Sequence, residues 1–120
     1  MQKEIMLIII VGLLFSFVGF SPFQTIVVEE PAAAGKELST HVNLRNDLDE
    51  KVEDVNVRVF IYDLGLAFYS TGFDISKKDG KGLWVLGDLP RNIPKGDYLA
   101  RVTASNDHFR DVRHVYIAVE

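Results

Sequence analysis

The densest group of ionisable side chains lies near the C-terminal end, in the segment SNDHFRDVRH (Ser105–His114). Asp107 stands next to His108, and Asp111 stands three residues before His114. Carboxylate oxygens and imidazole nitrogens of this kind are ligands for divalent metal ions. However, the spacing matches no standard zinc pattern. We therefore interpret the segment as a polar loop between two strands, with mixed charges that form local ion pairs.

A second polar group, Asn46–Asp54, holds five carboxylates. Clustered oxygens favour calcium, but the segment lacks the glycine and the ligand periodicity of an EF-hand loop, and Lys51 lies in its middle. We therefore predict a solvated loop and keep Asp47, Asp49 and Glu50 only as weak candidates for a metal site. No cofactor is expected.

No catalytic motif accompanies these polar groups. The sequence has no cysteine, which excludes a disulfide framework, a thiolate zinc site and a cysteine nucleophile. It contains no Gly-x-Ser-x-Gly, His-Glu-x-x-His, Walker A or dinucleotide-binding pattern. We therefore predict that the protein is not an enzyme. The net charge of −4, without a basic stripe, also argues against nucleic-acid binding, because such a surface repels phosphates.

The segments that must position these loops alternate between apolar and polar residues with a period of two, which indicates half-buried strands. Val55–Tyr62, for example, places its four aliphatic residues at 55, 57, 59 and 61 on one face. The length of 120 residues allows one domain. We predict an all-β fold, a seven-stranded antiparallel immunoglobulin-like β-sandwich preceded by one N-terminal apolar helix. The predicted strands cover 25–29, 38–45, 55–62, 68–75, 83–86, 98–104 and 114–119, and Asp79–Gly80 is predicted as a turn.

Four short features extend this pattern over residues 25–120. They are Val28–Pro31 followed by Gly35–Leu38, the strand end Val42–Asn46, the strand Val55–Tyr62 after an acidic loop, and Pro94–Tyr98 before the last two strands. In this order they resemble the CARDB-type modules of prokaryotic cell surfaces, and fibronectin type III-like or other immunoglobulin-like domains are similar. The resemblance implies a seven-stranded sandwich with an adhesive, assembly or spacer role and no catalytic residues.

Three residues are predicted to be structural. Gly96, together with Pro94, forms a turn at a corner of the sandwich. Tyr98 then enters a strand with its ring inward, where a tyrosine corner would bond its hydroxyl to a backbone group a few residues upstream. Trp84 is predicted to be the core tryptophan of the sandwich.

Phe60 and Tyr62 are the main candidates for a partner contact. Both face outward if the aliphatic residues of their strand face inward, and exposed aromatic patches mark partner surfaces. Alternatively, the segment Phe68–Phe73 covers both rings. The loop between the last two strands supplies three further contact candidates, His108, Phe109 and Arg110. The phenylalanine of this loop either tucks under the sandwich or points outward.

The N-terminus carries an uncharged apolar segment, residues 5–20. A helix of this length rises ~24 Å, short of the ~30 Å hydrocarbon core of a bilayer. A signal-anchor transmembrane helix, a cleaved signal peptide and a buried core helix are the three alternatives. We assign 1–23 to the signal peptide or signal anchor and 24–120 to the sandwich. Lys3 favours a cytoplasmic N-terminus, so we expect the sandwich to be extracytoplasmic, either membrane-anchored or secreted to the cell surface.

These observations leave three functional hypotheses. The first is a non-enzymatic extracytoplasmic module for protein–protein interaction, adhesion or cell-surface structure, which binds an unknown protein or a second copy of itself. The second is a surface-filament subunit in which residues 25–29 complete the sheet of a neighbouring subunit by strand addition. The third is an accessory domain that binds a divalent ion or a carbohydrate.

Overall fold

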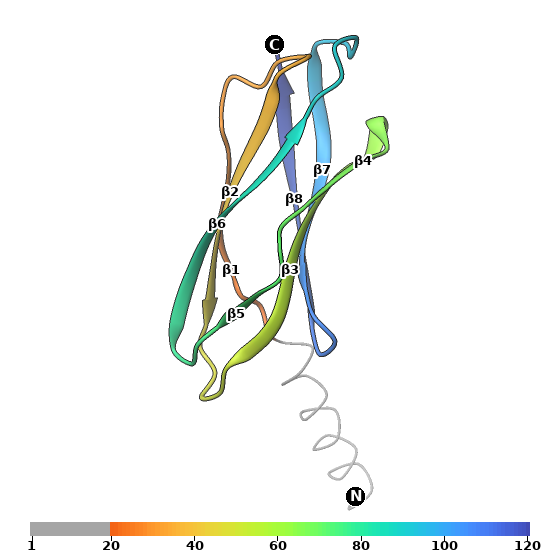
Figure 1. The fold of residues 1–120 in the computed structure, drawn as a ribbon. Helices are drawn as coiled ribbons and strands as arrows, with labels where there is room; N and C mark the ends of the chain where they lie inside the picture. The colour runs from red at the N-terminus through yellow and green to blue at the C-terminus, as the bar shows by residue number, and fades with distance from the viewer. Residues whose placement is uncertain (1–19) are drawn as a thin grey trace, which may run out of the picture.

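The computed structural model describes residues 20–120, which form a long, narrow β-sandwich (Figure 1). The helix predicted at the N-terminus, and most of the segment 1–23, fall outside this range. Eight strands and one short 3-10 helix make up the described part of the chain. They are β1 (Phe23–Val28), β2 (Glu37–Asn46), β3 (Val52–Ile61), η1 (Tyr62–Leu64), β4 (Leu66–Tyr69), β5 (Phe73–Ile75), β6 (Asp79–Asp88), β7 (Gly96–Ser105) and β8 (Arg110–Val119). Within these residues no helix has the length and hydropathy to cross a membrane.

Two antiparallel sheets face each other in the sandwich. One has the order β1-β2-β6, and the other has the order β4-β3-β7-β8, with β5 also paired to β3. After β1 the chain passes a cis peptide bond between Glu30 and Pro31, and Ala32 then forms a parallel bridge with Val119 of β8. The N-terminal part of the domain therefore contacts both sheets. The prediction of an all-β antiparallel sandwich is confirmed.

The predicted count of seven strands is wrong for the described residues, because the segment predicted at 68–75 forms two strands. Both β4 and β5 pair with β3, but the ladder is interrupted between them. There the Ser70 amide donates to the carbonyl of Val57 (2.8 Å), while the Ser70 hydroxyl accepts from the amide of Val57 (2.8 Å). A side chain thus replaces the backbone carbonyl as the acceptor, and regular pairing ends at this point.

The inward faces of three strands agree with the alternation in the sequence. Every predicted inward residue of β2, β3 and β7 is buried, and this confirms the phase of all three strands. These residues are Leu38, Thr40, Val42, Leu44, Val55, Val57, Val59, Ile61, Tyr98, Ala100, Val102 and Ala104. Together with Val85 of β6 and Ile117 of β8, they form a core between the two sheets.

The prediction that Trp84 is a core residue is wrong. Trp84 is 53% exposed and lies on the outer face of the three-stranded sheet, whereas the neighbouring Val85 is 1% exposed. β6 pairs with β2 so that Val85 lies opposite the buried Thr40 and Trp84 lies opposite His41. The run Leu83–Leu86 is apolar at every position and carries no alternation, so its phase comes from this pairing. The turn predicted at Asp79–Gly80 is also displaced, since both residues belong to β6 and the turn precedes them.

Tyr98 lies at the corner where β7 begins. Its side chain is 8% exposed, and its hydroxyl donates a hydrogen bond of 2.6 Å to the carbonyl oxygen of Pro94. This is the geometry of a tyrosine corner, in which the buried hydroxyl satisfies a backbone group upstream. Gly96 lies between the two bonded residues with a φ of 146°, a conformation that residues with a Cβ rarely adopt.

We expect Tyr98→Phe to lower the free energy of unfolding by about 1 kcal/mol, the usual net contribution of one hydrogen bond. Urea denaturation of the full-length chain in a mild detergent, followed by far-UV circular dichroism, measures this change. Tyr116→Phe is the matched control, because Tyr116 is 71% exposed. An equal loss in both variants would show that the corner bond adds no stability.

Residues before position 24 also contact the sandwich. The ring of Phe20 packs edge-on against Phe109 with 4.8 Å between centroids. The carbonyl of Pro22 accepts a hydrogen bond of 2.8 Å from the amide of Arg45. Residues 20–23, which the sequence assigned to the N-terminal segment, are therefore in contact with the folded domain.

Candidate functional site

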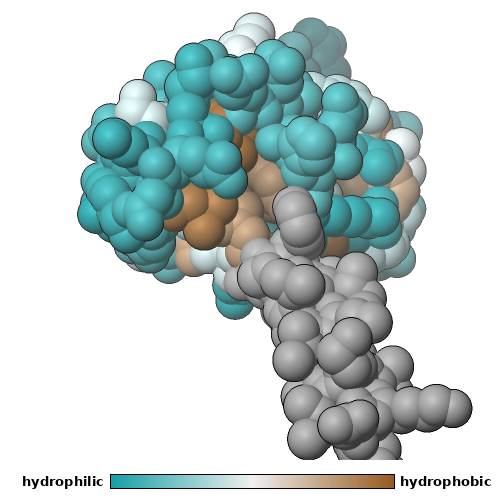
Figure 2. Space-filling model, turned by 90° about the horizontal axis from the view of Figure 1, so that it is seen from below, coloured by the Kyte–Doolittle hydropathy of each residue, from teal (hydrophilic) through white to brown (hydrophobic). Residues whose placement is uncertain are grey.

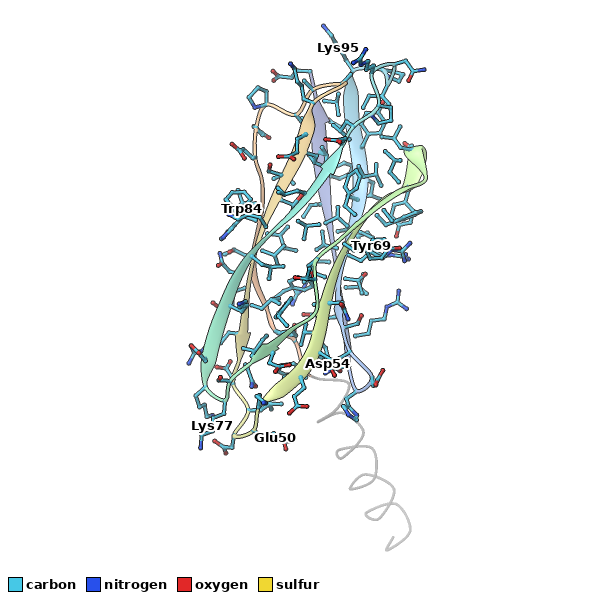
Figure 3. All side chains as sticks on the ribbon, viewed as in Figure 1. Glu50, Asp54, Tyr69, Lys77, Trp84 and Lys95 are labelled. Atoms are coloured by element: carbon cyan, nitrogen blue, oxygen red, sulfur yellow. The ribbon has the colours of Figure 1, made fainter. Side chains whose placement is uncertain are left out.

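The outer face of the five-stranded sheet carries a continuous row of aromatic and cationic side chains. We call it the aromatic–arginine face and define it by six residues from β3, η1, β4, β7 and β8. They are Arg58, Phe60, Tyr62, Tyr69, Arg101 and His114. In Figure 3, Tyr69 projects from β4 on the side of the molecule opposite to Trp84.

The arginines and the aromatic rings alternate along this row. The Arg58 guanidinium lies 5.0 Å from the centroid of the Phe60 ring and 5.7 Å from that of Tyr69. The Arg101 guanidinium lies 5.4 Å from the centroid of Phe60 and 5.6 Å from that of Tyr62. Each arginine is therefore within cation–π distance of two rings. This packing holds both guanidinium groups against the aromatic rings of the sheet.

Tyr62 closes the row at its other end. Its ring packs against Phe60 at a centroid distance of 5.4 Å and stacks on His114 at 6.0 Å. The Tyr62 hydroxyl and His114 Nε2 are 3.1 Å apart, at hydrogen-bond distance. Tyr62 lies in η1, which follows β3, and His114 lies on the edge strand β8. The row therefore crosses β7 and reaches the edge of the sheet.

Neither arginine of this face has a carboxylate partner among residues 20–120, where the ion pairs involve other cations. The Nε atoms of Arg58 and Arg101 are buried and make no hydrogen bond within this part of the chain. A guanidinium that is partly desolvated without a counter-charge is an unusual and costly arrangement. A negatively charged ligand that approaches the face would therefore meet the terminal Nη atoms of the two arginines and not the buried Nε atoms.

The strand register shows how far the positive character extends. Arg110 lies at the lower end of the same face, opposite Ser105, and Tyr116 lies at the upper end, opposite Leu99. Between the Ser105–Arg110 pair and the Leu99–Tyr116 pair, no outward position of β3, β7 or β8 carries an Asp or Glu. Because the whole chain has a net charge of −4, the face is a local positive region on an acidic molecule.

Of the segment Phe68–Phe73, the predicted alternative cover for Phe60 and Tyr62, the Phe68 ring does not lie over them, because it packs toward Gly87 of the opposite sheet. The two arginines cover Phe60, which is half-buried, and Tyr62 remains 39% exposed. The predicted pair therefore lies on a surface that is both aromatic and cationic.

The loop candidates lie elsewhere. Phe109 as a partner contact is a wrong prediction, because the residue is only 9% exposed and packs on Phe20. The side-chain oxygen of Asn106 accepts from the amides of His108 (2.8 Å) and Phe109 (3.1 Å), which folds the loop back under the sandwich. His108 and Arg110 are exposed. His114 is separated from the loop tip and belongs to the aromatic–arginine face.

The acidic loop between β2 and β3 makes ion pairs with nearby cations. Asp47 is 2.8 Å from Arg45, and Asp49 is 3.7 Å from Lys78. Glu50 is exposed, and its carbonyl accepts from Asn46 at 2.8 Å. The described part of the chain holds no group of three or more histidine or carboxylate side chains that could hold a metal ion.

A cavity of about 590 Å³ opens at the lower end of the sandwich, between the acidic loop and the β7–β8 loop. Leu48, Val52 and Phe109 contribute apolar walls, and charged residues such as Lys51 and Glu53 surround them. Figure 2 shows apolar surface at this end inside a hydrophilic rim. Lys51 is paired with Glu53 at 3.4 Å, so the cavity presents no excess of positive charge.

The sequence predicted only part of the aromatic–arginine face. The alternation that buries Val57 and Val59 already placed Arg58 outward with Phe60, and the burial of Ala100 and Val102 placed Arg101 outward. The sequence could not show that Phe60 pairs with Arg101, or that Arg101 pairs with His114, because these pairs join three different strands.

The comparisons with known proteins support the fold. No protein-family model matches the sequence, and no curated protein matches it. Among solved structures, the chain is similar to the CARDB domain of a Pyrococcus furiosus protein, a crystal structure in complex with di-metal ions. The TM-score is 0.57 at 18% identity, over 84% of this chain and 91% of that one.

Two further structures are similar at lower coverage of their own length. A family 123 glycoside hydrolase from Clostridium perfringens matches with a TM-score of 0.55 and 15% identity over 74% of this chain, which spans only 22% of that chain. The sporulation control protein Spo0M from Bacillus subtilis matches with a TM-score of 0.57 and 14% identity, over 84% of this chain and 50% of that one. By its fold, the described part of the chain is a CARDB-like, immunoglobulin-like β-sandwich domain.

Proposed function

We propose that the protein is a non-enzymatic, extracytoplasmic interaction module that binds an acidic segment of a partner protein through the aromatic–arginine face. The observation that carries the proposal is the pair of partly desolvated arginines, Arg58 and Arg101, which have no carboxylate partner in the described structure. A partner carboxylate would supply the missing counter-charge. Charge-assisted hydrogen bonds between arginine and a carboxylate are roughly twice as strong as neutral ones and are frequently bidentate.

The composition of the face supports a protein partner. Tyrosine and arginine are enriched at the centres of protein interfaces, and lysine and glutamate are depleted there. Tyr69 and Tyr116 are 63% and 71% exposed and lie next to the row of arginines. The extracytoplasmic location rests on the apolar segment 5–20 and on Lys3 before it. The non-enzymatic character rests on the absence of catalytic motifs from the sequence.

Strand addition is less well supported than binding through a sheet face. β1 pairs with β2 from Phe23 to Val28, and Ala32 is bonded to the C-terminal strand through the amide of Glu120 (2.9 Å). Release of β1 into a neighbouring subunit would break both sets of bonds. We therefore propose the sheet-face mode as the function of this domain.

A titration with a defined acidic peptide tests the proposal. We expect full-length protein to bind a peptide of alternating glutamate and glycine more tightly than the matched glutamine–glycine peptide, and the binding to weaken as salt is added. Calorimetry or the arginine side-chain resonances in NMR spectra measure it. The double variant R58Q/R101Q should lose at least tenfold in affinity, equivalent to about 1.4 kcal/mol.

The control is Arg91→Gln, which removes one positive charge from an exposed residue outside the face. We expect this variant to bind the peptide within about twofold of the parent, since long-range charge effects are screened. Equal binding of both peptides, or an equal loss in R91Q and R58Q/R101Q, would contradict recognition through this face.

A further inference from the structure

The outer face of the three-stranded sheet holds a second group of side chains, which the proposed function does not use. The register places Val27, His41 and Trp84 in one row across β1, β2 and β6. The next row consists of Thr25, Asn43 and Gly82. These six positions carry no acidic or permanently cationic side chain. They combine an exposed indole with neutral polar groups.

The indole of Trp84 is exposed but held in place. Its side chain is 53% exposed, and its ring packs on that of His41 at a centroid distance of 4.6 Å with an interplanar angle of 57°. Figure 3 shows Trp84 projecting from β6 away from the sandwich. An aromatic side chain that is ordered before binding loses little conformational entropy when a ligand stacks on it.

Two polar side-chain atoms lie over residue 82, a glycine beside the indole. A Cβ built at Gly82 would lie 3.0 Å from Asn43 Oδ1 and 3.5 Å from His41 Nε2. The first contact is tighter than ordinary packing, so a side chain at this position would displace Asn43. The Asn43 amide donates to the Thr25 hydroxyl at 2.7 Å, which fixes the orientation of Asn43 and leaves Oδ1 as an acceptor beside the glycine.

An aromatic face beside a hydrogen-bond acceptor and a ring nitrogen suits a ligand that is apolar on one side and hydroxylated at its edge. A pyranose sugar has this character: its axial C–H bonds carry small positive partial charges, which complement the negative face of an indole. Its equatorial hydroxyls can donate to Asn43 Oδ1 and bond to His41 Nε2. The lack of charge in the two rows favours a neutral sugar over a charged one.

We propose that the surface formed by His41, Asn43, Gly82 and Trp84 is a carbohydrate-binding site for neutral pyranose sugars. It lies on the sheet opposite to the aromatic–arginine face, so the proposal stands independently of the function proposed above. Leu86 and Val27, which are 50% and 56% exposed, extend the apolar surface on either side of the indole.

The sole tryptophan of the chain makes the test direct, because any change in tryptophan fluorescence on adding sugar reports on Trp84. Full-length protein is titrated with hexasaccharides of the cello-, manno- and chito- series. We expect at least one series to shift or quench the emission at millimolar concentration. Trp84→Ala, measured by calorimetry, should abolish binding of the same sugar.

Two glycines of the same strand supply the matched pair of variants. Gly82→Ala places a methyl group 3.0 Å from Asn43 Oδ1 and displaces this acceptor, so we expect at least a tenfold loss of affinity for the sugar. Gly80→Ala adds the same methyl two residues away, where the nearest atom is at an ordinary contact distance of 3.4 Å. It should leave binding within about twofold. Far-UV circular dichroism verifies that both variants are folded.

Three results would overturn the proposal. The first is the absence of binding by all three series, and the second is an equal loss of affinity in the two glycine variants. The third is self-association of the parent protein that Trp84→Ala removes, because the indole would then belong to an interface between copies. Peptide binding through the aromatic–arginine face would be unaffected by any of these outcomes, so the two proposals fail separately.

Discussion

Asn46→Ala is expected to lower the free energy of unfolding by about 3 kcal/mol, because each buried polar group left without a partner costs about 1–3 kcal/mol. Asn46 is 0% exposed and ends β2. Its amide nitrogen donates to the carbonyls of Glu50 (2.8 Å), Ile75 (3.1 Å) and Ser76 (3.2 Å). Its side-chain oxygen accepts from the amide of Leu48 (3.0 Å).

This single side chain joins the acidic loop to the end of β5. Since it belongs to the three-stranded sheet and Ile75 belongs to the five-stranded one, it also connects the two sheets at the lower end of the sandwich. Water can reach Glu50 and Ser76, which are exposed, but not the buried Ile75. The expected cost is therefore smaller than the sum of four lost bonds.

Asn46→Asp distinguishes hydrogen bonding from simple packing at this position. The carboxylate has the same shape as the amide but places an oxygen where the amide group donated to three carbonyls. At neutral pH we expect it to destabilise the domain at least as much as alanine, because the buried charge would face three carbonyl oxygens and keep only the Leu48 amide as a donor. If Asn46 stabilised the domain only by packing, Asn46→Asp would destabilise it less than Asn46→Ala, because Asp has the same shape as Asn.

Urea denaturation of the full-length chain in mild detergent measures both variants, with circular dichroism and the fluorescence of Trp84 as independent probes. Asn56→Ala is the control, since Asn56 is exposed and donates only one long bond of 3.3 Å to Asp54. We expect this variant to stay within about 0.5 kcal/mol of the parent, as most surface substitutions do.

The example of Asn46 shows which parts of the fold could be predicted from the sequence. Strand alternation identified the faces of β2, β3 and β7, because most inward positions of these strands are apolar and most outward positions are polar. It did not predict the burial of Asn46, which was assigned to the solvated loop Asn46–Asp54, and nothing local indicates that its partners come from Ile75 and Ser76. These lie about thirty residues later in the chain, and only the packing of the two sheets brings them near.

The errors at Trp84 and at the segment 68–75 have a related origin. An apolar run such as Leu83–Leu86 is compatible with either phase, so the pairing with β2 decides which residues face the core. The division between β4 and β5 depends on a side-chain bond of Ser70 to β3. In both places long-range pairing determines the structure, and the local sequence does not contain it.

The same reasoning applies to the two candidate sites. Arg58 with Phe60 on β3 is visible in the sequence as an outward pair two positions apart. The outward phase of Gly82 and Trp84 on β6 is not visible there, because the run Leu83–Leu86 does not alternate. Their partners Arg101 and Asn43 lie on neighbouring strands, and the register that aligns them follows from the complete sheets. The sequence therefore predicts part of the aromatic–arginine face. The strand register supplies the rest of that face and the whole of the surface around Trp84.

Gly87→Ala is expected to destabilise the domain by about 2–3 kcal/mol, at the upper end of the usual cost of overpacking a core. Gly87 belongs to β6 and Phe68 to β4, in opposite sheets. The aromatic ring of Phe68 packs directly on the glycine, so that a Cβ at position 87 would overlap the ring. The methyl group can enter only if the ring rotates away or the two sheets separate at this edge.

A double-mutant cycle identifies the ring as the cause. Phe68→Ala alone should cost about 2 kcal/mol, less than a fully buried phenylalanine, because the ring is half-buried. In that background Gly87→Ala should add less than about 0.5 kcal/mol, since its obstacle is gone. The coupling energy between the two substitutions is then about 2 kcal/mol, within the range found for residues in direct contact.

Gly72→Ala is the control for the intrinsic effect of replacing glycine in an extended segment. A Cβ at that position would meet only the side-chain oxygen of Asn56, at an ordinary distance of 3.5 Å. We expect this variant to be neutral or slightly stabilising, because alanine restricts the unfolded chain. If Gly87→Ala were equally mild, or equally costly with and without Phe68, the ring would not lie over Gly87. The contact that joins β4 to β6 would then have to be replaced by another packing of the two sheets.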